Sequence, residues 1–199
     1  MTTPSLDAYA LTTLPTVVQE LQIKQRNPDM DALLVRLIDR ASARCNTHCG
    51  RRLKSTTYAA ATALVLNGDG THEIIVPEFP VTALASVKQR LSDGSSQPLD
   101  ISGARFDANL IYLPNSIAPS GTLNIVVECT AGYLTGTHVY ELTGLEDACV
   151  AIVRIAWQDY QTQIGRGVEA NVAGGSIRMI DAPLPLNIRG MLDPYRRLS

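Results

Sequence analysis

Apolar side chains recur every three or four residues between Pro28 and Leu53. This spacing places them on one face of a helix, at positions Met30, Leu33, Leu34, Leu37, Ile38, Ala41, Cys45 and Cys49. Asn27 can cap the first free amides, and Gly50 can supply the left-handed residue that ends a helix. The pattern therefore predicts a long amphipathic helix, the clearest in the chain.

The pattern changes after Ser55. Short segments rich in β-branched and aromatic residues follow one another, separated by turns such as Asn67-Gly68-Asp69-Gly70. The predicted strands lie at residues 56–58, 64–66, 73–76, 81–91, 110–113 and 123–128. Short strands at such close intervals predict a small antiparallel β-sandwich or barrel of about five to seven strands.

A second long helix is predicted to begin at Thr143 and to end at Gly165. The phrase Thr143-Gly144-Leu145-Glu146 has the form of a capping box, in which the threonine oxygen and the glutamate carboxylate bond to backbone amides. Apolar residues cover more than half of this helix, so we expect it to be mostly buried. Beyond it, residues 168–180 fit either a hairpin or a loop, and an arginine-bearing segment closes the chain at residues 186–198.

These elements predict an α+β fold in which a helical assembly domain is interrupted by an inserted β domain. Residues 1–54 supply the N-terminal arm and helices, residues 55–140 the β domain, and residues 141–199 the second long helix and the tail. A chain of 199 residues is long enough to bury a sizeable core and carry such an insertion. We expect the two ends, residues 1–11 and 181–199, to be extended segments that order on docking to a partner.

Composition narrows the classes of partner. A net charge of -2 and a pI of about 5.9 give no overall attraction to nucleic acid or to an anionic membrane. No apolar run approaches the roughly 20 residues that cross a bilayer, and the first residues lack the features of a signal peptide. We therefore expect a protein made in a cytoplasm, without membrane contact. Its four cysteines indicate reduced, buried thiols rather than a disulfide framework.

The sequence shows no catalytic, cofactor-binding or metal-binding constellation. It contains no phosphate-binding loop, no Gly-x-Ser-x-Gly and no His-Glu-x-x-His, and no nucleophile is paired with a base. We therefore expect no enzyme. Cys45, His48 and Cys49 are close enough in sequence to bind zinc with a fourth ligand. Because both cysteines are on the apolar helix face, packing in the core is the preferred interpretation.

Five arginines on the first long helix and just after it are candidate functional residues. Arg36, Arg40 and Arg44 follow one another at four-residue steps beside the apolar face, and Arg51 and Arg52 come just after the helix. Guanidinium groups suit phosphate oxygens, so contact with DNA is one interpretation. The other, which the acidic composition favours, is a solvated flank or an ion-pair seam between subunits.

Three short sequence motifs occur in the same order as in a known protein family. They are residues 37–53, ending in Cys-Gly-Arg-Arg-Leu; residues 76–81, Val-Pro-Glu-Phe-Pro-Val; and the pair Leu-Glu-Asp-Ala at 145–148 and Leu-Asp-Pro-Tyr-Arg-Arg at 192–197. Together they resemble the head-to-tail connector, or adaptor (head completion), proteins of tailed bacteriophages and gene transfer agents. The resemblance spans most of the chain, although its long β region is similar only to the longer adaptors.

The resemblance implies a structural virion protein at the head–tail junction. Members of that family assemble, usually as twelve copies, into a homo-oligomeric ring beneath the portal. The ring extends the channel through which double-stranded DNA passes without sequence recognition, and it docks the next neck or tail protein. The residues assigned to ring contacts or the channel wall are Arg36, Arg40, Arg44, Arg51 and Arg52. Those assigned to portal or tail docking are Tyr195, Arg196 and Arg197.

Two other functions fit the same residues. A tail-side completion or stopper protein of the same neck would share these features. A β-sandwich recognition module on a helical stalk is a second alternative, for example one that binds carbohydrate. The single Trp and two Phe of the chain count against it, because sugar-binding platforms use exposed aromatic faces.

Overall fold

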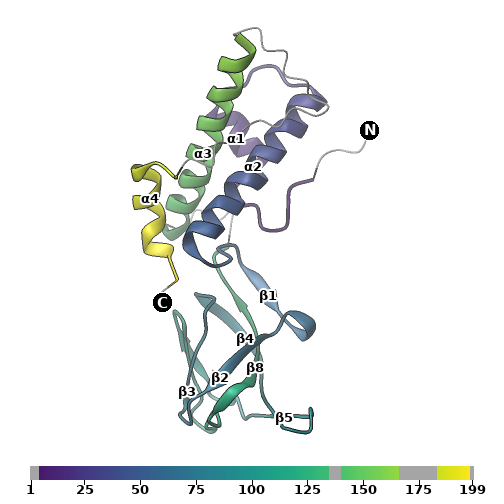
Figure 1. Cartoon of the computed structure of the whole chain (residues 1–199), viewed down its shortest axis with the longest axis vertical. Helices are drawn as coiled ribbons and strands as arrows, with labels where there is room; N and C mark the ends of the chain where they lie inside the picture. Colours follow the sequence, from purple (N-terminus) through teal and green to yellow (C-terminus); the bar gives the residue numbers. More distant parts are fainter. Residues whose placement is uncertain (1–4, 135–139, 166–182, 198–199) are drawn as a thin grey trace. The chain divides into compact units, whose positions relative to one another are not determined.

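The computed structural model describes residues 5–134, 140–165 and 183–197 (Figure 1). The chain divides into two compact units. The helical unit is built from the two ends of the chain (Met1–Leu53 with Thr135–Ser199), and the β unit is built from its middle (Lys54–Leu134). The α+β class predicted from the sequence is confirmed. None of the helices within the described ranges is both long and apolar enough to span a membrane.

Two long helices form the centre of the helical unit. They are α2 (Pro28–Cys49) and α3 (Tyr140–Gly165), which pack against each other (Figure 1). The shorter α1 (Leu14–Glu20) and α4 (Leu186–Leu192) pack on this pair, and a 3-10 turn, η2 (Asp193–Tyr195), follows α4. The fully buried side chains of this unit include Leu34, Leu37, Ile38, Leu145, Ile188 and Leu192.

The boundaries of α2 are those that the sequence predicts. The Asn27 Oδ1 atom accepts a hydrogen bond from the Met30 N–H at 2.7 Å, which satisfies one of the free amides at the helix start. At the other end, Gly50 has φ +68°, and its N–H donates to a carbonyl of the last turn. The apolar face and both terminal signals are local to one segment, so the prediction is confirmed.

The predicted start of α3 is wrong. The helix begins at Tyr140, three residues before Thr143, since Tyr140, Glu141 and Leu142 contain nothing that breaks a helix. The Oε1 atom of Glu146, the glutamate of the predicted capping box, accepts a hydrogen bond from the Thr12 hydroxyl at 2.9 Å. Glu146 of the predicted capping box thus joins α3 to a distant segment of the chain, and the motif does not mark the start of the helix.

The ends of the chain are packed where the structure describes them. Ala10 and Leu11 are buried, and the Leu11 N–H donates to the Ser42 hydroxyl on α2 at 3.0 Å. Ile188 and Leu192, one turn apart on α4, are both 0% exposed. The expectation that these ends order only on docking is therefore wrong for residues 5–11 and 183–197. Residues 1–4, and the hairpin or loop at 168–180, lie outside the described residues.

The β unit contains two antiparallel sheets. The long strand β8 (Gly121–Ala131) is central to the larger sheet, which has the order β1-β8-β4-β5, with β2 also paired to β8. The smaller sheet has the order β3-β7-β6. The remaining strands are β1 (Thr56–Tyr58), β2 (Leu64–Gly68), β3 (Glu73–Ile75), β4 (Val81–Arg90), β5 (Ser96–Pro98), β6 (Arg105–Asp107) and β7 (Leu110–Tyr112).

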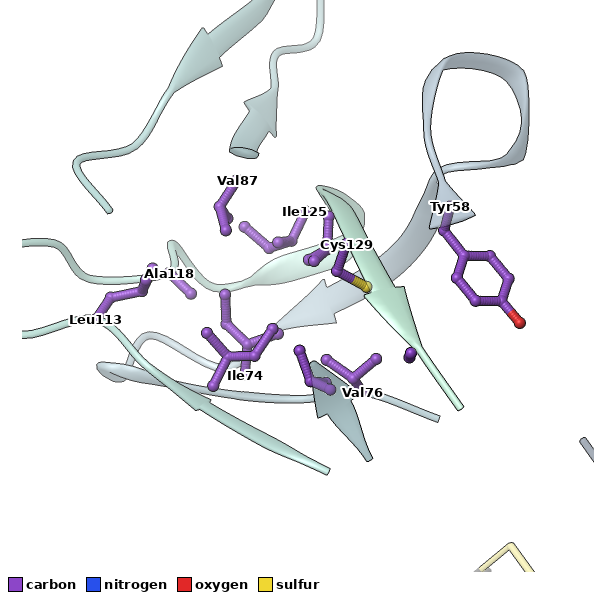
Figure 2. Close-up of a cluster of buried hydrophobic side chains, with 12 residues drawn as sticks. Tyr58, Ile74, Val76, Val87, Leu113, Ala118, Ile125 and Cys129 are labelled. Atoms are coloured by element: carbon purple, nitrogen blue, oxygen red, sulfur yellow. The ribbon is translucent and has the colours of Figure 1, made fainter. Parts of the chain in front are cut away.

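The two sheets share one hydrophobic core. Ile74 and Ile111 from the smaller sheet, with Val76 just beyond β3, lie near Val87 and Ile125 from the larger one (Figure 2). The sheets stay open, so the unit is a small sandwich rather than a closed barrel. The sequence did not indicate β5 or β6, because every residue of these two strands is exposed and neither shows the alternation of a half-buried strand.

Candidate functional site

The end of α2 brings together the predicted arginines and the closing segment of the chain. We call this region the α2 junction: residues Cys45–Leu53, with Tyr9 from the N-terminal arm and Asp193–Arg197 from the C-terminal segment. The Cys49 carbonyl accepts a hydrogen bond from the Arg197 N–H at 2.9 Å. The last carbonyls of a helix lack partners within the helix, so this bond fixes the C-terminal segment on the end of α2.

Arg51 is the buried arginine of the junction. Its side chain is 5% exposed, and its Nε–H donates to the Tyr195 carbonyl at 2.8 Å. A buried guanidinium needs such partners because burial without them is unfavourable. The His48 Nε2 atom lies 3.2 Å from the Asp193 Oδ1 atom and adds a second contact to η2. Arg51 therefore holds the closing segment in place within one chain.

Arg52 contacts the N-terminal arm instead. Its Cζ atom lies 4.4 Å from the centre of the Tyr9 ring, a cation–π arrangement. The next residue, Leu53, donates its N–H to the Asn46 Oδ1 atom at 3.0 Å. The phrase Cys-Gly-Arg-Arg-Leu thus connects the end of α2 to the N-terminal arm and to the C-terminal segment.

The arginine stripe on α2 is partly open to solvent. Arg36 and Arg40 are exposed, whereas Arg44 is half-buried. The Arg36 Nε–H donates weakly to the Ala32 carbonyl of the same helix at 3.4 Å. The Asp39 carboxylate, on the same helix, accepts a hydrogen bond from the Asp7 N–H at 3.0 Å. Arg36 and Arg40 therefore retain their charged ends at the surface.

The three residues assigned to docking differ in exposure. Tyr195 is half-buried, and its hydroxyl lies 3.1 Å from the point where a side chain on Gly144 would begin. Arg196 and Arg197 are exposed. Tyr195 therefore packs on the start of α3, and the two arginines next to it present their charge to solvent.

The candidate zinc ligands turn toward different partners. The Cys49 thiol donates to the Leu192 carbonyl at 3.6 Å, His48 faces Asp193, and Cys45 contacts Cys149 on α3. The hydrogen bond with Cys149, together with burial, raises the pKa of Cys45 far above its ordinary range, and burial raises the pKa of Cys49 to about 11. Protonated, buried thiols are poor metal ligands and poor nucleophiles. Within the described ranges, no three ligating side chains form a group that could hold a metal ion.

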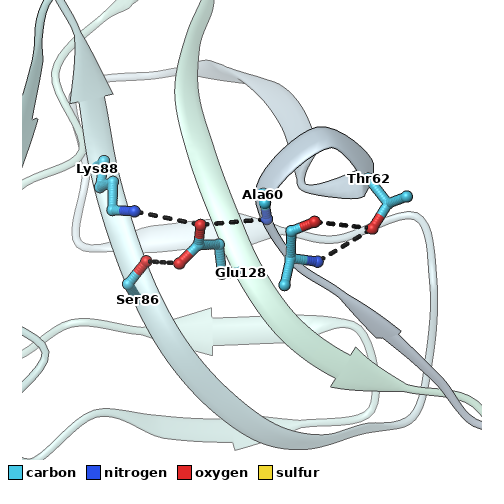
Figure 3. Close-up of polar contacts among 6 residues, drawn as sticks. Ala60, Thr62, Ser86, Lys88 and Glu128 are labelled. Carbon is cyan, nitrogen blue, oxygen red and sulfur yellow. Dashed lines mark hydrogen bonds and ion pairs between the residues drawn. The ribbon is translucent and has the colours of Figure 1, made fainter.

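A polar network on the β unit was not evident from the sequence. The Glu128 carboxylate on β8 accepts hydrogen bonds from the Ser86 hydroxyl at 2.6 Å, from Lys88 Nζ at 3.2 Å and from the Ala60 N–H at 3.4 Å (Figure 3). The Ser86 bond, followed by Lys88, holds the pKa of Glu128 below its usual range. The ionised carboxylate fixes the 3-10 turn η1 (Ala60–Thr62) to the sheet. The cross-strand pairing of residues 86 and 128 is the missing signal, because register is not visible in sequence.

The sequence model of the head completion protein family matches residues 10–198. No curated protein matches the chain. The fold is similar to that of chains in gene transfer agent (GTA) particles. A chain in the neck of an empty GTA particle, computed with C6 symmetry, is 15% identical, with a TM-score of 0.60 and coverage of 100% of this chain and 95% of that chain.

Two further GTA chains have the same fold. One, from the virion of a native GTA particle, is 16% identical, with a TM-score of 0.56 and coverage of 100% of this chain and 95% of that one. The other, from the neck of a native GTA particle computed with C12 symmetry, is 19% identical, with a TM-score of 0.53 and coverage of 100% and 97%.

Proposed function

Because the chain belongs to the head completion protein family, we propose that it is a non-enzymatic structural protein of a virion neck. The family match over residues 10–198 is the observation that carries this proposal, since it includes the whole β unit and all but the terminal residues of the helical unit. The protein is made in the host bacterial cytoplasm and joins the head–tail junction of a phage or GTA-like particle. The side chains of the α2 junction hold chain segments together, which suits a structural role.

The proposed assembly is a homo-oligomeric ring beneath the portal. Twelve copies are compatible with both the C6 and the C12 symmetry of the neck particles that contain similar chains. The helical unit makes the ring contacts, and DNA passes through the ring without sequence recognition. The slightly acidic chain supports passage rather than tight binding, because strong phosphate contacts would retain the DNA.

Exposed cations mark the proposed contact surfaces of the helical unit. Arg36 and Arg40 contact a neighbouring copy or line the channel, whereas Arg196 and Arg197 contact the portal. Arg51 and Tyr195 support the second surface from within the chain, since they fix the segment that carries those two arginines.

Electron cryomicroscopy of particles that contain this chain tests the proposed function. The expected result is a ring of copies of this chain directly below the portal. A ring of this chain that contacts only another neck ring would instead identify a tail-side stopper. Particles whose necks lack the chain would contradict both functions. Binding of the purified chain to isolated portal, but not to isolated tails, would independently support the adaptor position.

A further inference from the structure

One end of the β unit presents apolar side chains on a tightly bonded backbone. We call this region the tip: the turn at residues 67–71 after β2 and the segment at residues 114–124 that leads into β8. Ile117 is 51% exposed and Leu123 is 55% exposed. Single exposed apolar side chains are common on protein surfaces and need no explanation. A function for Ile117 and Leu123 therefore has to be inferred from how the backbone around them is held.

Two asparagines tie the halves of the tip together. The Asn67 Oδ1 atom accepts a hydrogen bond from the Leu123 N–H at 2.8 Å. Asn124 accepts from the Gly68 N–H at 2.9 Å and donates from its Nδ2 to the Pro119 carbonyl at 2.7 Å. These bonds lie where the pairing of β2 with β8 shifts register, so side chains there replace the regular ladder.

The segment before β8 is also anchored in the core. Ala118 is 1% exposed, lies within the hydrophobic cluster (Figure 2), and exchanges backbone hydrogen bonds with the 67–71 turn: its N–H donates to Thr71 and its carbonyl accepts from Gly70. His72 Nδ1 lies 2.8 Å and 2.9 Å from two carbonyl oxygens, those of Leu113 and Ser116. Since carbonyls only accept, this nitrogen carries a proton and donates.

Leu123 is held in a conformation that leucine disfavours. Its φ is +51°, in the left-handed region. Its exposed side chain gains little from burial in return, so the surrounding bonds maintain the strain. Strain of this kind is typical of functional positions. Gly68 shows how closely the parts fit, because a Cβ there would lie 1.9 Å from the Pro119 carbonyl oxygen.

The tip carries no cation, and its one charged side chain is the exposed Asp69 of the 67–71 turn. Residues 108–127 include no Asp, Glu, Lys, Arg or His, although charged residues make up 18% of the chain. A surface without cations has nothing to pair with phosphate. A partner that covers Ile117 and Leu123 must be uncharged where it contacts them, because a charge buried against these apolar side chains would lack a counter-charge.

The tip lies far along β8 from the points where the chain enters and leaves the β unit. Those points are adjacent: the Ser55 N–H donates to the Tyr133 carbonyl at 2.7 Å, and Thr56 pairs with Ala131 at the end of β8. Gly121, at the start of β8, belongs to the tip. At about 3.3 Å per residue, the strand separates the two ends by roughly 33 Å.

We propose that the tip docks, through Ile117 and Leu123, on an apolar surface of a different protein of the neck. This inference rests on the proposed function, in which the helical unit makes contacts between copies. The tip is the part of the β unit farthest along β8 from its connections to the helical unit, so it is suited to reach a separate protein. Ile117 and Leu123 are the contact side chains, and Asn67 and Asn124 position them.

Photo-crosslinking in intact particles tests this inference. A benzoylphenylalanine is placed at position 117, and a matched control is placed at position 75, where Ile75 is 70% exposed on β3 outside the tip. The expected crosslink joins position 117 to a different neck protein and is absent from position 75. Crosslinks only to DNA or to another copy of this chain, or none at all, would overturn the inference.

Substitutions supply a second test that separates docking from folding. The pair Ile117→Ser and Leu123→Asn removes both apolar side chains, and asparagine tolerates the left-handed conformation. We expect the variant to enter particles at the wild-type level while retention of the crosslinked neck protein falls about tenfold or more. Ile75→Ser should leave retention unchanged.

Loss of retention in both variants, or in neither, would contradict a specific role for the tip. Loss of the variant chain itself from otherwise intact heads would identify another copy as the occupant and would also overturn the inference. The proposed function is judged separately, from the presence of the wild-type chain in the neck.

Discussion

Arg51 and Arg52 are neighbours in sequence, yet their side chains make different kinds of contact. The left-handed Gly50 turns the chain at the end of α2. Arg51 is then buried against the Tyr195 carbonyl, whereas Arg52 lies on the exposed side against the Tyr9 ring. The sequence pattern placed both on one basic surface, because their burial is decided by segments that are distant in the chain. The role of Arg51 in ring contacts stays a prediction, and its role within the chain is visible.

This difference predicts unequal effects on stability. Arg51→Ala leaves the partly buried Tyr195 carbonyl without the Arg51 donor, so we expect the free energy of unfolding to fall by about 2 kcal/mol. Arg52→Ala removes an exposed cation–π contact, so about 0.5 kcal/mol is expected. Urea denaturation at a concentration where the chain is monomeric measures both values. Equal losses in the two variants would show that Arg51 does not stabilise the C-terminal segment in this way.

Glu128 gives a pH-dependent prediction. Because the Ser86 hydroxyl and Lys88 lower its pKa in the folded state, the ionised carboxylate stabilises the fold fully at pH above the ordinary glutamate value of about 4.3. This contribution is lost as the pH falls through the lower folded-state pKa. Glu128→Gln should therefore be less stable than the wild type at pH 7, and the difference should vanish in acid.

Thermal unfolding between pH 3 and 7 measures the effect of Glu128. Ser86→Ala serves as the matched variant, because it removes the first of the hydrogen bonds that lower the pKa. In that background the pH-dependent difference should shrink. A stability difference between Glu128→Gln and wild type that stays constant over this range would contradict the argument.

At the scale of elements, helix and strand boundaries were predicted well where their signals lie within one segment. They were predicted poorly where contacts between distant segments decide them. The sequence gives the apolar face and both ends of α2 directly, and these were confirmed. The start of α3 was misplaced because Glu146 contacts Thr12 on another segment. β5 and β6 were missed because their order comes from pairing with β4 and β7 rather than from burial. The tip could not be predicted, since its bonds join residues more than forty positions apart.

Helix α4 shows how a short segment becomes ordered by packing. Isolated helices of seven residues are unstable in water, so its burial must hold it. Ile188→Ala or Leu192→Ala, each at a fully buried position, should lower the free energy of unfolding by about 2–5 kcal/mol. Leu186→Ala, on the same helix but 83% exposed, is the control and should change it little. Chemical denaturation distinguishes these results, and similar losses at positions 186 and 188 would contradict the packing argument.

At the scale of the whole molecule, the proposed function assigns assembly to one unit and docking to the other. The helical unit carries exposed arginines, whereas the tip of the β unit carries exposed apolar side chains and no cation. Ring formation should therefore respond to charge and salt, and docking of the tip should respond to apolar area. The overall composition averages over both units, so it indicated neither the exposed arginines of one nor the apolar tip of the other.

Charge reversal of the α2 stripe tests the assembly role. Arg36→Glu with Arg40→Glu should reduce the yield of rings, because like or unmatched charges would face each other at a subunit seam. Monomer stability should change little, since both side chains are exposed. Arg90→Glu with Arg105→Glu, two exposed arginines of the β unit, is the control. Normal rings that fail only to retain or eject DNA would place the stripe on the channel wall instead.

The chain enters and leaves the β unit at adjacent positions, and this affects how such proteins can evolve. Lys54 bridges to Tyr133, and the Ser55 N–H bonds to the Tyr133 carbonyl. The whole insertion is therefore attached through neighbouring backbone positions. Its removal leaves a gap that a short linker closes at small entropic cost. A single in-frame deletion or exchange can thus remove or replace the β unit as a cassette, and descendants can acquire a different docking module on the same helical frame.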